Sequence, residues 1–351
     1  MKRSRAPAWL LAMLALLAAA AFVASLALGE VRLAPSEVLG VLMGRGNGLA
    51  RTVVLDFRLP RALVGMAVGA GLAASGVLMQ SFFRNPLASP GLLGVSTGGA
   101  LGAVAALAMG WASNSVFALP AASIAGAFLA TFAVMALAKR EASAEHLLLA
   151  GVALNALFGA ATSFILNLTA GQFEVTGQIV FWMLGGLENR TWAHVWMVLP
   201  GTVLGCLLLL PYGRALNLLS LGELGAQSLG VNVRRLQWEI IALSTILTAL
   251  ATAVGGVIGF VGLVVPHVLR LGLGPDHRRL LPLSMIGGAA FVLACDLITR
   301  FLPGELRLGV VTALIGGPFF LWMLRRGPTL GFRRKPRNEP LDVARDSGGP
   351  A

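Results

Sequence analysis

Long apolar runs repeat along almost the whole chain, and this feature most constrains what the chain can fold into. Ten such runs can be marked, at residues 8–28, 61–82, 92–111, 115–138, 146–169, 192–210, 236–258, 260–273, 280–300 and 308–324. A helix that crosses the hydrocarbon core of a bilayer needs about 20 apolar residues. The pattern therefore predicts an all-α polytopic membrane protein with about ten transmembrane helices.

The composition leads to the same conclusion. Of the 351 residues, 57% are hydrophobic and only 12% are charged. A soluble domain carries roughly 25% charged residues, about twice this share. So little polar surface excludes a water-soluble enzyme.

The positive charges indicate the orientation in the membrane. The chain has 27 Lys and Arg against 15 Asp and Glu, for a net charge of +12. They lie in short clusters between apolar runs and form no basic face interleaved with aromatic residues, which argues against nucleic-acid binding. With the N-terminus inside, 19 of the 27 fall on the inner side, as the positive-inside rule requires. We therefore expect both termini in the cytoplasm.

The two ends of the chain are interpreted as follows. The first run, 8–28, is long for a signal peptide and no clean small-residue cleavage site follows it, so we expect a retained helix. Residues 1–326 are expected to form one transmembrane permease domain. Residues 327–351 are polar, basic and rich in Pro and Gly, and are expected to be a disordered cytoplasmic tail.

Several kinds of chemistry lack their sequence signatures. No Gly-x-x-x-x-Gly-Lys-Ser/Thr motif occurs, so the chain has no P-loop with which to hydrolyse ATP. Cys206 and Cys295 lie inside apolar runs, and the four histidines are far apart in sequence. We expect no catalytic residues, no cofactor and no metal site.

An ion-coupled carrier is also disfavoured. Such transporters usually keep carboxylates or histidines within the membrane as ion relays. The deepest acid here is Asp296, four residues before Arg300 on one helix face, where an i,i+4 pair would neutralise both charges. The sequence offers no obvious relay.

Three segments depart from plain membrane helix. Two arginines flank Leu-Pro at 58–61, on the outer side; they fit either interfacial snorkelling or docking of an acidic external protein. Prolines and glycines interrupt the apolar pattern at 84–94 and again at 259–267, and paired broken helices point to a transport path. The loop 211–235 is broken by glycines into two short amphipathic helices; it is either an ordinary interfacial loop or a coupling surface for a cytoplasmic motor.

Taken together, these segments resemble the FecCD family, the permease subunits of type II ABC importers for iron-siderophores, haem and cobalamin. The resemblance is carried by RLPRALVGMAVGAGLAASGVLMQSFFRNPLASPGLLGVSTGGALGA (58–103), LLLAGVALNALFGA (147–160), FWMLGGLENRTW (181–192), LNLLSLGELGAQSLGVNVRRL (216–236), IGFVGLVVPHVLRLGLGPDHRRLLPLS (258–284) and ELRLGVVTALIGGPFFLWMLRR (305–326). It spans about 30–326.

The resemblance implies a set of partners. They are a second copy of the chain, two ABC ATPase subunits on the inner side, one substrate-binding protein on the outer side, and the lipid of a bacterial plasma (inner) membrane. The substrate would pass along the homodimer interface. Ferric siderophore is the first expectation, with cobalamin and haem as alternatives.

The resemblance also implies roles for named residues. Arg58, Arg61 and Arg300 match the arginines that dock the binding protein. Gly222, Glu223, Ala226 and Gly230 match the ATPase-coupling surface, and Ser143, Ala144 and Glu145 match the cytoplasmic gate. Ala144-Glu145 departs from the small hydroxyl residues of the cobalamin permease, and Arg307 stands where family members often have proline after Glu-Leu. This extra outer charge would either extend the docking surface or have no role.

Overall fold

The computed structural model describes residues 8–29, 31, 33–45, 48–113, 115–137, 144–302 and 306–325. Secondary structure in these ranges is helical throughout. Ser143 and the predicted tail at 327–351 lie outside them. The α-helices are α1 (Ala8–Ala27), α2 (Pro35–Leu42), α3 (Gly48–Thr52), α4 (Leu59–Phe82), α5 (Val95–Ala108), α6 (Ala118–Leu137), α7 (Ala144–Leu168), α8 (Phe173–Met183), α9 (Trp192–Leu209), α10 (Gly213–Leu219), α11 (Glu223–Ser228), α12 (Val233–Gly255), α13 (Val261–Leu273), α14 (His277–Phe301) and α15 (Leu308–Arg325).

The ten predicted runs correspond to ten of these helices. Eight are long and apolar enough to cross a membrane, and α5 and α13 are shorter apolar helices. Each helix begins and ends within three residues of its predicted run. The prediction of an all-α polytopic membrane protein with about ten transmembrane helices is confirmed.

The two shorter helices begin after breaks in the helical pattern, of which the sequence located one. The interruption predicted at 84–94 does separate α4 from α5, whereas most of the one predicted at 259–267 is helical, because α13 begins at Val261 and contains Pro266. The 14 residues of α5 and the 13 of α13 each extend only about 20 Å, less than the roughly 30 Å of a hydrocarbon core. Non-helical chain precedes both, with Gly94 (φ +77°) before α5 and Gly256 (φ +69°) between α12 and α13. Each interrupted segment therefore needs shielding by the rest of the protein.

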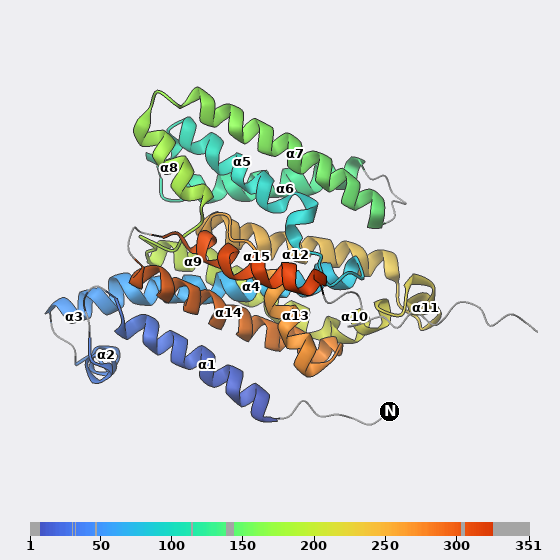
Figure 1. Ribbon diagram of the computed structural model, residues 1–351, viewed down its shortest axis with the longest axis horizontal. Coiled ribbons are helices and arrows are strands. Elements are labelled where there is room, and N and C mark those ends of the chain that lie inside the picture. Colours follow the sequence, from blue (N-terminus) through green and yellow to red (C-terminus); the bar gives the residue numbers. More distant parts are fainter. Residues whose placement is uncertain are drawn as a thin grey trace, which may run out of the picture.

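The helices form two groups (Figure 1). In one, α5 packs against α6, α7 and α8; in the other, α4 packs against α9, α12, α13 and α14, and α12 joins the two groups through α5 and α6. Helix α4 is the centre of the bundle, since most of its residues are buried. Helix α1 lies on the outside of α14.

Backbone-to-backbone contact holds α4 and α14 together. A Cβ added to Gly69 would lie 2.2 Å from the carbonyl oxygen of Gly288, and one added to Gly288 would lie 2.2 Å from that of Gly69. Glycine is required at such a crossing because any side chain would separate the helices. Gly69 belongs to one of the small-residue repeats that mark close helix contact in the sequence.

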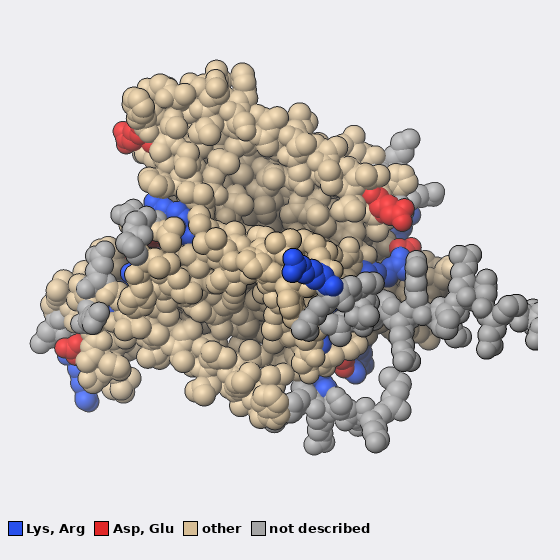
Figure 2. Space-filling view, viewed as in Figure 1, with Lys and Arg blue, Asp and Glu red and all other residues tan. Residues whose placement is uncertain are grey.

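Large apolar side chains cover much of the outer surface of the bundle. Examples are Trp196 on α9, Phe132 on α6 and Leu314 on α15, each at least 66% exposed. Most charged side chains on the face seen in Figure 2 lie near the two ends of the molecule. A band of exposed apolar side chains between charged ends fits a protein surrounded by lipid.

Candidate functional site

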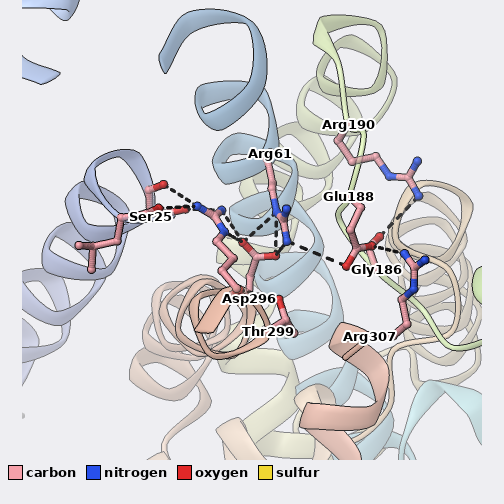
Figure 3. Close-up of polar contacts among 10 residues, drawn as sticks. Ser25, Arg61, Gly186, Glu188, Arg190, Asp296, Thr299 and Arg307 are labelled. Carbon is pink, nitrogen blue, oxygen red and sulfur yellow. Dashed lines mark hydrogen bonds and ion pairs between the residues drawn. The ribbon is translucent and has the colours of Figure 1, made fainter. Parts of the chain in front are cut away.

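At the outer end of α4 and α14, a cavity of about 670 Å³ is lined by charged side chains. The lining includes Arg58 and Arg61 at the start of α4, Arg300 at the end of α14, and Glu188, Arg190 and Arg307 from the segments before α9 and α15. Figure 3 shows most of this cluster, with carboxylates between guanidinium groups. Among these charged residues, Arg58 and Arg307 are 249 positions apart in the sequence.

Arg58 is committed to the main chain of α1. Its side chain is buried, and its guanidinium donates hydrogen bonds to the carbonyl oxygens of Leu26 (2.8 Å), Ala27 (2.9 Å) and Val31. The last carbonyls of a helix have no partner within the helix, so Arg58 caps the C-terminus of α1. Neither snorkelling nor free exposure describes this side chain.

Asp296 is fully buried between two arginines. Its carboxylate accepts from Arg61 Nη2 at 2.7 Å and from Arg300 Nη2 at 2.6 Å, and both Nε atoms add bonds of 3.0 to 3.1 Å. Charge-assisted bonds of this kind are among the stronger ones in proteins. The predicted pairing of Asp296 with Arg300 is confirmed. The participation of Arg61 has no local sequence signal.

Arg300 is held on its other side by α1. Its guanidinium donates to the Ser25 carbonyl oxygen at 2.8 Å and to the Ser25 hydroxyl at 3.0 Å. Only 9% of the Arg300 side chain is exposed. Arg300 therefore links α14 to α1 and offers little surface to the outside.

The remaining acid, Glu188, faces the cavity. Arg307 Nη1 donates to it at 2.9 Å, and Arg61 Nη2 lies 4.0 Å from its other oxygen. The Arg307 guanidinium also lies over the ring of Phe181, 4.3 Å from its centre. Glu188 and Arg190 belong to the stretch 181–192, which helped to carry the resemblance but to which the sequence analysis assigned no role.

At the inner end, the loop 211–235 forms the two predicted short helices, α10 and α11. Gly222, with a φ of +102°, separates them, and Gly230, with a φ of +84°, ends the turn after α11. Glu223 is exposed and accepts a hydrogen bond from Gln237 at 3.0 Å. Ala226 is fully buried, so its methyl group points into the protein. Leu221, Leu224 and Leu229 are the large exposed side chains here, and the sequence analysis missed them.

A chain of polar contacts ties α10 to α14 and α4. Ser81 Oγ and His277 Nε2 share a hydrogen bond of 2.8 Å, and His277 Nδ1 donates to Asn217 Oδ1 at 2.8 Å. Asn217 Nδ2 donates to Asp276 at 2.7 Å. Hydrogen bonding from Arg278 lowers the pKa of Asp276 to about 2, so this carboxylate is ionised at neutral pH. The first of the two short helices is thus fixed to the membrane bundle.

Two of the three predicted gate residues, Ala144 and Glu145, lie within the described ranges. Ala144 begins α7, and Glu145 is exposed in the first turn of that helix, where a negative charge favours the helix dipole. Within the described ranges, no group of three or more His, Cys, Asp or Glu side chains is placed to hold a metal ion.

Comparison with known proteins identifies the family. Residues 16–326 match the model of the FecCD transport family. The chain is 44% identical to the cobalamin import system permease protein BtuC of Halobacterium salinarum, over 79% of this chain and 74% of that protein. It is 42% identical to the hemin transport system permease protein HmuU of Yersinia pestis, over 78% and 83%.

Two further comparisons cover more of the chain. The vitamin B12 import system permease protein BtuC of Klebsiella pneumoniae is 37% identical over 93% of this chain and 96% of its own length. A solved inward-facing structure of an ABC transporter assigned to the metal-chelate type superposes with a TM-score of 0.82 at 34% identity, covering 91% of this chain and 99% of that one. The bundle, with its charged outer cavity and its two short inner helices, belongs to the FecCD transport family of ABC importer permeases.

Proposed function

We propose that the chain is the membrane-spanning subunit of a bacterial plasma-membrane ABC importer for a metal chelate, with cobalamin as its first substrate. The matches over 78 to 93% of the chain, to relatives named for cobalamin and hemin import, carry this proposal. Haem is the second candidate. The expectation of a ferric siderophore stays a prediction, because the most similar relatives reported above carry other names.

The proposed assembly contains two copies of this chain, two ATPase subunits and one substrate-binding protein. The charge of the outer cavity supports docking of an acidic protein surface there, since complementary charges steer encounter and set register. The exposed leucines in and beside α11, Leu221, Leu224 and Leu229, support docking of a motor subunit at the inner end, because a short helix with an apolar face fits a hydrophobic groove.

The mechanism follows from these two surfaces. A loaded binding protein docks at the outer end, and ATP binding closes the two motor subunits. Helices α10 and α11 pass that motion to the bundle, which alternates between outward and inward access. Arg58, Arg61 and Arg300 keep their proposed part in docking, with Arg58 and Arg300 acting from within by fixing α1 and α14.

An ion-coupled transporter is the rival from another class. Its best relay candidate would be Asp296, the fully buried acid of α14. Two arginines already bond this carboxylate, Arg61 on one oxygen and Arg300 on the other. A carboxylate with both oxygens held in this way is an unsuitable ion relay.

Uptake in a strain deleted for this chain tests the proposal. Labelled cobalamin, hemin and ferric siderophores are supplied in parallel, with the chain restored on a plasmid as the control. We expect chain-dependent uptake of cobalamin. Uptake of hemin or a siderophore alone would keep the importer and replace the substrate, and equal uptake of all three with and without the chain would contradict the proposed function.

A further inference from the structure

The acid that faces the outer cavity, Glu188, occupies a position suited to a carboxylate from outside. One oxygen accepts from Arg307 at 2.9 Å and the other lies 4.0 Å from Arg61. Asp296, the other acid of the cluster, is fully buried behind the arginines and saturated by them. Glu188 is 31% exposed in its side chain, so it can leave this position without disturbing the core.

The loop holds Glu188 in place by folding its side chain back over Gly186. A Cβ added to Gly186 would lie 2.0 Å from Glu188 Oε2. The φ of Gly186 is not in the left-handed region, so alanine is compatible with its backbone. The carboxylate can therefore lie here only because Gly186 has no side chain. A methyl group at residue 186 would displace the flexible end of the Glu188 side chain.

Two of the arginines around Glu188 have N–H donors that make no hydrogen bond. Arg190 makes one long hydrogen bond, 3.5 Å to the Gly186 carbonyl oxygen, and its buried Nε has no partner. The Nε of Arg307 is likewise buried without a partner. Burial, together with the charges of Arg61 and Arg307, lowers the pKa of Arg190, and Glu188 opposes this. A buried donor without a partner lowers the stability of the folded protein, so binding of a further hydrogen-bond acceptor by this cluster would be favourable.

The charge balance supports the same conclusion. Of the charged residues described around the cavity, Arg58 and Arg300 are bonded to main-chain carbonyls and Asp296. Arg61 shares Asp296 with Arg300, but its Nη2 also lies 4.0 Å from Glu188. Arg190 and Arg307 have no bond to Asp296, and Glu188 is the acid set against these three arginines. Three guanidinium groups with one partly exposed carboxylate form a site for an anion whose shape matches bidentate arginine binding.

We infer that Glu188 is a built-in stand-in for an acidic side chain of the docking partner, which displaces it and bonds to Arg61, Arg190 and Arg307. The identity of that partner as a substrate-binding protein rests on the proposed function. In the free permease, Glu188 partly neutralises the arginines and competes with weakly matched anions. Docking exchanges this internal contact for external ones and gives Arg190 the acceptor it lacks.

Two variants of the loop distinguish competition by the Glu188 side chain from the effect of its negative charge. Glu188→Gln removes both the competitor and one negative charge, whereas Gly186→Ala displaces the competitor and keeps its charge. Glu174→Gln is the matched control, because Glu174 is an exposed acid of α8 that does not line the cavity. Arg51→Gln is the control for Arg190→Gln, since Arg51 is exposed on α3 and also lies away from the cavity lining.

The full-length chain in lipid nanodiscs is titrated with a fluorescent hexaglutamate peptide, with hexaglutamine as the uncharged control peptide. We expect Glu188→Gln to bind hexaglutamate about tenfold tighter, Gly186→Ala about threefold tighter and Arg190→Gln about tenfold weaker. Arg190→Lys should recover part of the loss. Both control variants should stay within about twofold of the parent chain.

The result that overturns the inference is a Glu188→Gln or Gly186→Ala variant that binds hexaglutamate no more tightly than Glu174→Gln. The cellular uptake assay then distinguishes this failure from failure of the proposed function. If the chain imports a chelate but the loop variants bind hexaglutamate no more tightly than the control, the stand-in role is contradicted and the proposed function is not. The expected order of peptide affinities without any chelate uptake supports the anion site and contradicts the proposed function.

Discussion

At the outer and inner ends of the bundle, different kinds of contact join the helices, although the same two central helices, α4 and α14, reach both ends. At the outer end, charged hydrogen bonds of Arg61 and Arg300 to Asp296 join α4 to α14. At the inner end, a hydroxyl, an imidazole and an amide, those of Ser81, His277 and Asn217, join α4 and α14 to α10. The outer end carries surplus positive charge, and the inner end links a short surface helix to the bundle.

This difference suits the two proposed tasks. A partner that arrives from solution is attracted by unbalanced charge, which acts over a distance of about one Debye length. A motor that stays attached needs a stiff connection, which short hydrogen bonds and close packing provide. A Cβ on Gly213 of α10 would lie 2.8 Å from the Cα of Arg278, so α10 also rests directly on the beginning of α14.

Helix α14 connects the two regions. It contributes His277 at its inner end and Asp296 and Arg300 near its outer end, and its 25 residues extend over about 37 Å. A helix of this length, packed along α4, moves as a unit more easily than it bends. We therefore expect changes at the two ends of α14 to influence one another, and the following predictions separate their contributions.

The largest expected effect is at the outer pair. Asp296→Asn removes the buried counter-charge that Arg61 and Arg300 share, which costs roughly 3–5 kcal/mol. Thermal unfolding of the purified chain should show a clear drop in midpoint, whereas Glu174→Gln should leave the midpoint near that of the parent. A midpoint for Asp296→Asn equal to that of the parent would show that the pair does not hold α4 to α14.

A smaller effect is expected midway between the two ends, where α4 and α14 meet through glycine. Gly69→Ala places a methyl group 2.2 Å from the Gly288 carbonyl oxygen, and such overpacking costs roughly 1–3 kcal/mol. Gly159→Ala on α7 is the matched control, because nothing lies within 4 Å of its added Cβ. Equal unfolding midpoints for the two alanine variants would rule out the close crossing.

The smallest effect on stability, with a specific effect on transport, is expected at the inner end. Asn217→Ala removes the link between His277 and Asp276 and should lower stability by about 1 kcal/mol. In the assembled importer, we expect ATP hydrolysis to continue while chelate uptake per ATP falls severalfold. Ser228→Ala, on exposed α11 with only a local bond to Gly225, should leave this ratio unchanged. An unaltered ratio of uptake to ATP hydrolysis in Asn217→Ala would show that α10 does not take part in coupling.

Much of the fold could be predicted from the sequence because membrane helices leave a local signal. The apolar runs located the eight helices long enough to cross a membrane and the two shorter apolar helices. Clusters of Pro and Gly located the interruption before α5 and the break between α10 and α11, but placed the second interruption too late in the chain, within α13. The i,i+4 spacing of Asp296 and Arg300 was sufficient to predict their pair. Each of these features depends on residues that are neighbours in the chain.

The candidate site was predictable only in part. Arg61 and Asp296 are 235 positions apart, and Arg307 and Glu188 are 119 apart, so no spacing rule connects them. The inward direction of Ala226 and the capping of α1 by Arg58 depend on how helices rotate and pack. The resemblance identified arginines of the outer end, but their division into structural and cavity-facing groups required the three-dimensional arrangement.

Uptake into proteoliposomes that contain the chain with its co-purified ATPase tests the central claim most directly. Labelled cobalamin and the binding protein are supplied on one side, and ATP or an imposed proton gradient is the only energy source. The account predicts uptake that requires ATP hydrolysis and is unaffected when ionophores collapse the gradient. Uptake driven by the gradient without ATP would contradict it and would make the chain a secondary transporter.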